Sequence, residues 1–145
     1  MFNIILLSFG NVVKGIVSIA SKRDNSFKNR LNSRNMTIVI KTKGNREAVQ
    51  YILENGEIYL KKGSKYLAPD PDISVTFLNA KSAYFTVLKP TPKLVIDSFM
   101  NALGNGELKL EFKAESLMWL VETMKKLPSS LNLKSIRYAL RGKLL

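Results

Sequence analysis

The stretch ELKLEFKAE, residues Glu107 to Glu115, alternates apolar and charged side chains along most of its length. Successive residues of an extended strand point to opposite faces, so the two kinds of side chain would lie on opposite sides of a sheet. Such alternation is typical of an antiparallel sheet that has one packed face and one face in water. The apolar set is Leu108, Leu110 and Phe112, and the charged set is Glu107, Lys109, Glu111 and Lys113.

Four further strands are predicted before this one. The stretch Met36 to Lys43 is rich in β-branched residues, which favour strands, and Ile73 to Leu78 reads in the same way. Between them, residues Glu47 to Lys62 form two runs joined by Asn55-Gly56. This dipeptide tolerates the positive φ angles of a type I′ turn, so it predicts a β-hairpin.

Helical patterns flank and interrupt these strands. Asn79 is placed to cap a helix that runs to Leu88, and Pro92 opens a second helix that ends at Gly104. A third is predicted from Ser116 to Leu127. Strands and helices are thus largely segregated along the chain. The pattern predicts an α+β fold, a five-stranded antiparallel sheet with helices packed on its one dry face.

The N-terminal apolar stretch predicts an amphipathic helix, because its apolar residues recur at steps of three and four. Lys14 interrupts the stretch, which favours neither a signal peptide nor a membrane-spanning helix. The helix either packs on the domain or attaches the N-terminus to a membrane. The polar residues 21–35 that follow read as a loop with a short helical turn. The recurring apolar residues of the predicted N-terminal helix are Phe2, Ile5, Phe9, Val12, Val13, Ile16 and Ala20.

The formal net charge of +12 is concentrated at the two ends of the chain. Residues 1–45 carry eight basic groups against Asp24 alone, and residues 116–145 carry six against Glu122. The middle is neutral. A charge of this kind attracts polyanions such as anionic membranes or nucleic acid. We expect a single domain, 1–145, with an N-terminal helix and basic loop (1–35), a sheet–helix core (36–127) and a basic C-terminal helix (128–145).

The predicted C-terminal helix carries an apolar stripe and a basic stripe. It would lie on an anionic bilayer, or it would be an ordinary last helix with a solvated basic face. The apolar stripe is Leu133, Ile136, Leu140 and Leu144, and the basic one, a predicted contact for membranes or other polyanions, is Lys134, Arg137 and Arg141.

Residue types argue against catalysis. The chain has no cysteine and no histidine, which removes thiolate nucleophiles and the commonest general base and metal ligand. Asp70 and Asp72 form the closest pair of carboxylates, but alternate residues of an extended segment point apart. We expect them only to solvate the turn before a strand. No catalytic residue, metal site or cofactor is predicted.

From Asp24 to Leu127 the order of motifs resembles the lipid-binding domain of the type-two sterol carrier protein family, in particular its small stand-alone prokaryotic members. The residues that carry the likeness are the Asn55-Gly56 hairpin, the segment PDISVTF before two helices, and GNGELKLEF running into SLMWLVETM. Two departures stand out: Phe112 replaces a later glycine of the pattern, and Asn79 or Lys81 stands where the family often has an acidic residue.

The resemblance implies an apolar tunnel between sheet and helices that holds a lipid: a fatty acid, a fatty acyl-CoA, a sterol-like molecule or a phospholipid. Capping this tunnel is a further possible role of the predicted C-terminal helix. We therefore expect a non-catalytic, cytoplasmic lipid-binding protein, peripheral at an anionic membrane surface, that transfers or stores its ligand. The alternative is a nucleic-acid-binding or protein-interaction module that uses the basic ends, although no nucleic-acid-binding signature appears.

The predicted ligand contacts come from the dry face of the sheet and from the helices. Each of these residues could equally be plain core. They are Val75, Phe77, Leu108 and Leu110 from the strands, and Phe85, Leu88, Phe99, Leu103, Met118, Val121 and Met124 from the helices.

Overall fold

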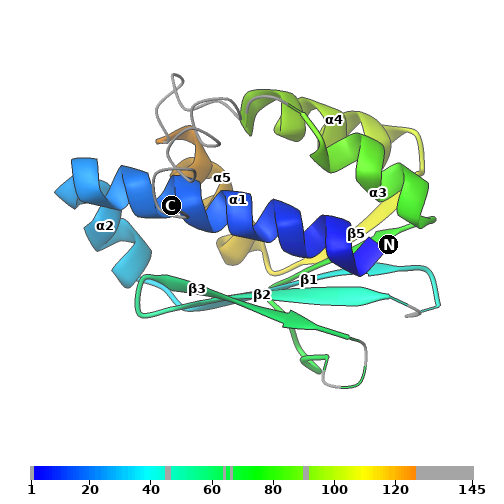
Figure 1. Cartoon of the computed structure of the whole chain (residues 1–145), viewed down its shortest axis with the longest axis horizontal. Helices are drawn as coiled ribbons and strands as arrows, with labels where there is room; N and C mark the ends of the chain where they lie inside the picture. Colours follow the sequence, from blue (N-terminus) through cyan, green and yellow to red (C-terminus); the bar gives the residue numbers. More distant parts are fainter. Residues whose placement is uncertain (1, 45–46, 64, 66, 90–91, 127–145) are drawn as a thin grey trace, which may run out of the picture.

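The computed structural model describes residues 2–126 apart from 45–46, 64, 66 and 90–91 (Figure 1). In this part of the chain five helices and five strands follow one another in the order predicted, with one extra helix near the start. The helices are α1 (Phe2–Arg23), α2 (Asn25–Asn32), α3 (Ala80–Val87), α4 (Pro92–Gly104) and α5 (Ala114–Lys125). The strands are β1 (Met36–Thr42), β2 (Ala48–Glu54), β3 (Glu57–Lys62), β4 (Ile73–Phe77) and β5 (Leu108–Phe112).

The five strands form one sheet in the order β3-β2-β1-β4-β5. Three neighbouring pairs are antiparallel, but β1 and β4 run parallel, with Ile40 opposite Val75. The prediction of a fully antiparallel sheet was therefore wrong at this one pair, and the sheet is mixed. The alternation of side chains identifies a strand and its faces but carries no information on the direction of its neighbour.

The parallel pairing of β1 and β4 results from the connection between β3 and β4. This connection carries the chain from one edge of the sheet past β2 and β1 before β4 begins. Its described residues 67–72 lie on the side of the sheet away from the helices (Figure 1). There the Ala68 N–H donates to the side-chain oxygen of Gln50 at 3.0 Å. Val39, Ala48 and Gln50, which alternate with the helix-facing residues, are all buried. The face expected to be in water is thus covered at its centre.

The helices cover the other face of the sheet (Figure 1). The main core lies between these layers and includes Ile40 and Val49 from the sheet and Ala83 and Ala102 from α3 and α4. The N-terminal helix packs on this face. A Cβ atom on Gly10 of α1 would lie 2.7 Å from the Tyr51 side chain and 2.8 Å from that of Leu60, so glycine lets the helix approach β2 and β3 closely.

Helix α2 occupies residues that we predicted to be mostly loop. The Asp24 carboxylate accepts hydrogen bonds from the backbone N–H groups of Ser26 and Phe27, which caps the helix. Phe27 and Leu31 are buried and form a second apolar cluster with Ile16 and Ala20 of α1. Two buried residues four apart were enough to anchor a helix that is otherwise polar.

Trp119 of α5 joins the two clusters, because it packs partly buried against both. The Arg30 guanidinium of α2 lies 5.6 Å from the centre of its ring. Arg30 also donates through Nε to Thr123 Oγ1 at 2.7 Å and forms an ion pair with Glu122 at 3.2 Å. These contacts fix α2 against α5.

Several local predictions are confirmed. Asn55 and Gly56 adopt φ angles of 53° and 78° in the β2–β3 turn, as the hairpin requires. The Asn79 side chain accepts from the Ser82 N–H at 2.9 Å and caps α3. The predicted basic helix at 128–145, with Lys134, Arg137 and Arg141, lies outside the described residues.

Candidate functional site

The strand residues predicted to contact a ligand lie at the centre of the core. Val75, Phe77 and Leu108 are buried, with Phe77 only 1% exposed. Phe77 pairs with Leu108 across β4 and β5, and Val75 pairs with Leu110. All four therefore face the helices from the same side of the sheet, as the alternation predicted.

Two residues of α4 complete this group from above. Phe99 and Leu103 are half-buried and pack against the core cluster, and so does Leu110 of β5. Six of the eleven predicted contacts thus form one apolar cluster between sheet and helices. Met124 of α5 is also half-buried. Whether these residues hold a ligand or only fill the core stays a prediction.

The remaining four predicted contacts lie on the outer surface of the helices. Phe85, Leu88, Met118 and Val121 are 38–63% exposed. In α3 the inward face is instead taken by Ala83, Thr86 and Val87, and in α5 by Ser116 and Thr123. The fully buried positions of these two helices thus hold small or medium-sized residues, whereas Leu117, Trp119 and Leu120 of α5 pack partly buried against the core.

The exposed apolar side chains extend over several elements. Leu94 and Met100 of α4 and Phe112 of β5 are 42–59% exposed as well. The Phe85 ring stacks edge-on with Tyr84, with 5.6 Å between the ring centres. Large apolar side chains of this kind on several neighbouring elements are typical of surfaces that meet a ligand, a membrane or a partner.

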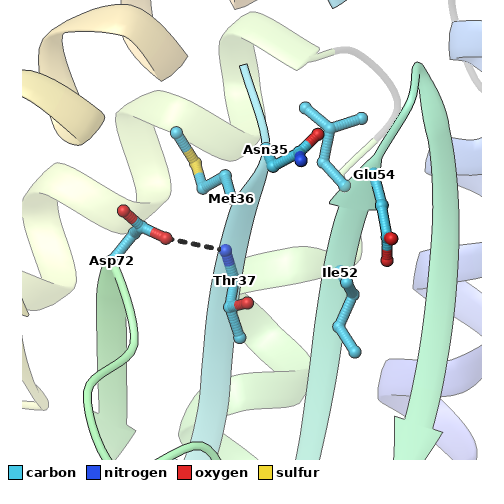
Figure 2. A pocket seen from close by; sticks show the side chains of 7 residues that line it. Asn35, Met36, Thr37, Ile52, Glu54 and Asp72 are labelled. Atoms are coloured by element: carbon cyan, nitrogen blue, oxygen red, sulfur yellow. Dashed lines mark hydrogen bonds between the residues drawn. The ribbon is translucent and has the colours of Figure 1, made fainter. Parts of the chain in front are cut away.

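One cavity of about 260 Å³ opens at the end of the sheet where β1 and β4 begin and β2 ends (Figure 2). Its lining is Asn35, Met36, Thr37, Ile52, Leu53, Glu54 and Asp72. A second, larger cavity lies between α1, α2 and the β2–β3 turn. Neither is lined by a residue of the predicted ligand set, so the tunnel that the resemblance implies stays a prediction.

Asp72 is the main polar junction at the first cavity. Its carboxylate accepts from the Thr37 N–H at 2.9 Å (Figure 2) and from the Ser116 hydroxyl at 2.8 Å. Arg34 donates in turn to Ser116 Oγ at 2.9 Å. The backbone of Asp72 donates to the Thr37 carbonyl and accepts from the Lys113 N–H. A single residue therefore ties β1, β4 and the start of α5 together.

The surroundings of Asp72 hold it in the ionised form. Burial alone would raise the pKa of Asp72, but the hydrogen bonds from Thr37 and Ser116 and the charges of Lys113 and Arg34 outweigh it and keep the pKa below its usual range. The carboxylate is thus occupied as an acceptor, which suits a structural role and not proton transfer.

The expectation that both aspartates only solvate a turn was therefore wrong for Asp72. Asp70 fits it better, because its side chain is 82% exposed and pairs with Lys113 Nζ at 3.0 Å. The group formed by Asp72, Ser116 and Arg34 was not predicted from the sequence. Aspartate is common just before a strand, and serine is common in the first turn of a helix. Their spacing in the sequence does not indicate that the two side chains are in contact.

The described residues carry neither a cluster of metal ligands nor a membrane-spanning helix. No group of three His, Cys, Asp or Glu side chains there could hold a metal ion. In the same part of the chain, every helix is too short or too polar to cross a membrane.

Comparison with solved structures finds sterol carrier proteins, the family that the sequence resembles. A conserved hypothetical protein of Thermus thermophilus, assigned as a possibility to the sterol carrier proteins, is 12% identical, with a TM-score of 0.48 over 91% of this chain and 86% of that one. The apo form of sterol carrier protein 2 from Yarrowia lipolytica is 17% identical, with a TM-score of 0.44 over 84% of this chain and 90% of that one.

A larger protein is found as well. An inverting sec-alkylsulfatase from a Pseudomonas species is 18% identical, with a TM-score of 0.44 over 72% of this chain. This chain spans only 14% of the length of that sulfatase. No protein-family profile and no curated protein sequence matches the chain.

Proposed function

We propose that this protein binds a lipid-like apolar ligand, without catalysis, between the sheet and the helices that cover it, and exchanges the ligand with a membrane surface. The observation that carries the proposal is the apolar cluster between the sheet and α4, where Phe99 and Leu103 lie half-buried against a continuous apolar face of β4 and β5. Phe85, Met100 and Met118 stay exposed on the outer side of α3, α4 and α5. These outer side chains offer apolar surface to the membrane with which the ligand would be exchanged.

The interior side of the proposed site would be the sheet face of β4 and β5. Val75, Phe77, Leu108 and Leu110 form a continuous apolar surface there. Phe99 and Leu103 lie above it as half-buried, movable side chains on one helix, α4. A ligand between these layers would displace side-chain contacts and would leave the polar junction at Asp72 unchanged.

Burial of methylene groups is sufficient to drive such binding. Each buried methylene contributes about 0.8 kcal/mol, so ten of them contribute about 8 kcal/mol before the cost of ordering the chain is subtracted. Before that cost, a gross value near 8 kcal/mol corresponds to a Kd on the order of micromolar, which is the tightest binding that ten methylenes would support. No dedicated hydrogen bond is needed, which agrees with an interior whose lining is apolar.

The proposal is tested by native mass spectrometry of freshly purified protein and by calorimetric titration with palmitate. Leu103→Trp adds volume between the layers and should weaken palmitate binding by about tenfold or more. Met100→Trp adds the same group on the outward side of the same helix and should change the Kd by less than about twofold. Protein that carries no lipid and does not bind palmitate would overturn the proposal, as would equal effects of the two variants.

A further inference from the structure

The second cavity has a volume of about 560 Å³ and lies between α1, the start of α2 and the turn from β2 to β3. One wall is a single face of α1. Lys14, Ser18, Ser21 and Lys22 follow one another at steps of four, three and one, so they share this face. Lys28 adds a third ammonium group from α2. We refer to this cavity as the lysine groove.

The charge of the lysine groove is unbalanced. Lys14, Lys22 and Lys28 are exposed, and none of them forms an ion pair with another residue in the described part of the chain. Glu57 is the one acidic residue in the lining, and its carboxylate already accepts a hydrogen bond from the Tyr59 hydroxyl at 2.7 Å. Three cations thus converge on one opening with a single, engaged anion.

The groove also has an apolar floor. Val17 of α1 and Ile58 of β3 line it and are half-buried. Val17 packs against the second apolar cluster, which holds it in place. Ser18 and Ser21 supply hydroxyl groups beside the lysines, and a hydroxyl can donate to an anionic oxygen. The combination is a cationic rim with hydroxyl donors above an apolar base.

We propose that the lysine groove binds the phosphate group of an amphiphilic phosphate ester, with the phosphate between the lysines and serines and the apolar part against Val17 and Ile58. Lysine acts as a point-charge partner for phosphate oxygens, and hydroxyl donors add charge-assisted hydrogen bonds. A volume of about 560 Å³ lies within the range of small-molecule sites. The groove shares no lining residue with the lipid site proposed above, so the two proposals stand or fall separately.

The test compares two triple variants of equal net charge in calorimetry at 0.15 M salt. One variant is Lys14→Gln, Lys22→Gln and Lys28→Gln, which removes the groove cations. The control is Lys43→Gln, Lys81→Gln and Lys93→Gln, which removes three exposed lysines elsewhere. The probe is a short-chain lysophosphatidic acid below its critical micelle concentration, and the matching monoacylglycerol is the phosphate-free comparison.

We expect the groove variant to bind lysophosphatidic acid at least tenfold more weakly than the unmodified protein and the control to change by less than about threefold. The monoacylglycerol should bind weakly to all three proteins, and palmitate binding should be the same in all three. Equal losses in both triple variants would mean attraction by diffuse charge and would overturn the proposal. Equally tight binding of the monoacylglycerol would overturn it as well.

Two sources of the phosphate are separated by a second arm. Vesicles of phosphatidylcholine with 20% phosphatidic acid are sedimented with each protein. Loss of binding in the groove variant alone would identify a headgroup within a bilayer as a ligand. Unchanged sedimentation together with weakened lysophosphatidic acid binding would identify a monomeric phosphate ester. The Ser21→Ala variant, which keeps all charges, should weaken the favoured probe by about threefold.

Discussion

Two sets of large apolar side chains, alike in composition, have opposite places in this protein. Phe77 and Leu108 lie in the interior beneath the helices, whereas Phe85 and Met118 lie on the outer surface of the same helices. The interior set comes from strands, where each residue has one of only two faces. The outer set comes from short helices that are apolar on more than one side, so the sequence does not show which side faces inward.

The comparison teaches that size and hydrophobicity do not decide which residues a thin helical layer buries. Ala83 and Ala102 occupy the inward positions of α3 and α4, and they let these helices approach the core cluster closely. Phe85 and Met100 on the same helices are then left outside, although Phe99 and Leu103 of α4 still reach the core. The surplus apolar surface is therefore a result of close packing, and the proposed exchange with a membrane depends on that surplus.

The largest expected effect comes from truncating the interior set. Phe77→Ala should lower the free energy of unfolding by about 3–5 kcal/mol, because it removes a fully buried ring from a packed core. Phe85→Ala should change it by less than about 0.5 kcal/mol, since that side chain is 57% exposed. Urea unfolding followed by circular dichroism measures both. Similar losses in the free energy of unfolding for Phe77→Ala and Phe85→Ala would show that the interior and outer sets do not differ in their contribution to stability.

An intermediate effect is expected at the polar junction below the interior set. Asp72→Ala should cost about 2 kcal/mol, because it removes the acceptor of two hydrogen bonds and leaves the buried Ser116 hydroxyl without it. Asp70→Ala, two residues away, should cost less than about 0.5 kcal/mol because it breaks only an exposed ion pair. Thermal unfolding of both variants checks this. An equal loss in Asp70→Ala would show that the junction contributes little.

A smaller effect is expected where the outer set is carried. Asn79→Ala removes the cap of α3 and should cost about 1 kcal/mol. Because α3 presents Phe85 and Leu88, amide hydrogen exchange should speed up in α3 and stay unchanged in β4. Faster exchange in both α3 and β4 would mean that the two elements open together. The outer and interior sets would then belong to a single cooperative unit.

The smallest expected effect is a dependence of stability on pH. The folded pKa of Asp72 lies below its unfolded value, so this carboxylate stabilises the fold above the unfolded pKa, and the contribution is lost as the pH falls from about 3.8 through the folded pKa. Asp72→Asn should therefore flatten the acid side of the stability curve. Unfolding by denaturant at pH 5, 4 and 3 tests this, with Asp70→Asn as the control. An unchanged acid slope in Asp72→Asn would contradict it.

The strands, the hairpin and the Asn79 cap were predictable because their signals are local. The alternation at Leu108 and Leu110 and the Asn55-Gly56 turn each act within a few residues. The parallel pairing of β1 with β4 was not predictable from such signals, because it depends on the route of a connection past two strands. The length of helix α2 was predicted too short for a similar reason. Phe27 and Leu31 are buried against α1, which is a tertiary contact, and not against residues next to them in the sequence.

The placement of the candidate residues was predictable for the strands and only in part for the helices, where Phe99 faces the core and Phe85 and Met118 do not. Val75, Phe77, Leu108 and Leu110 share the face that alternation assigned to them. The junction of Asp72 with Ser116 brings together residues 44 positions apart, and only the folded arrangement of β4 and α5 shows it.

Trp119 gives the protein a built-in optical reporter. It is the single tryptophan of the chain, and its ring lies between the two apolar clusters with the charged Arg30 group 5.6 Å away. Indole emission shifts with the polarity and charge around the ring, so one wavelength records whether α2 and α5 are in contact. Trp119 also borders the core above the sheet. A ligand that separates the sheet from the helices would therefore shift the emission maximum of Trp119 without any added label.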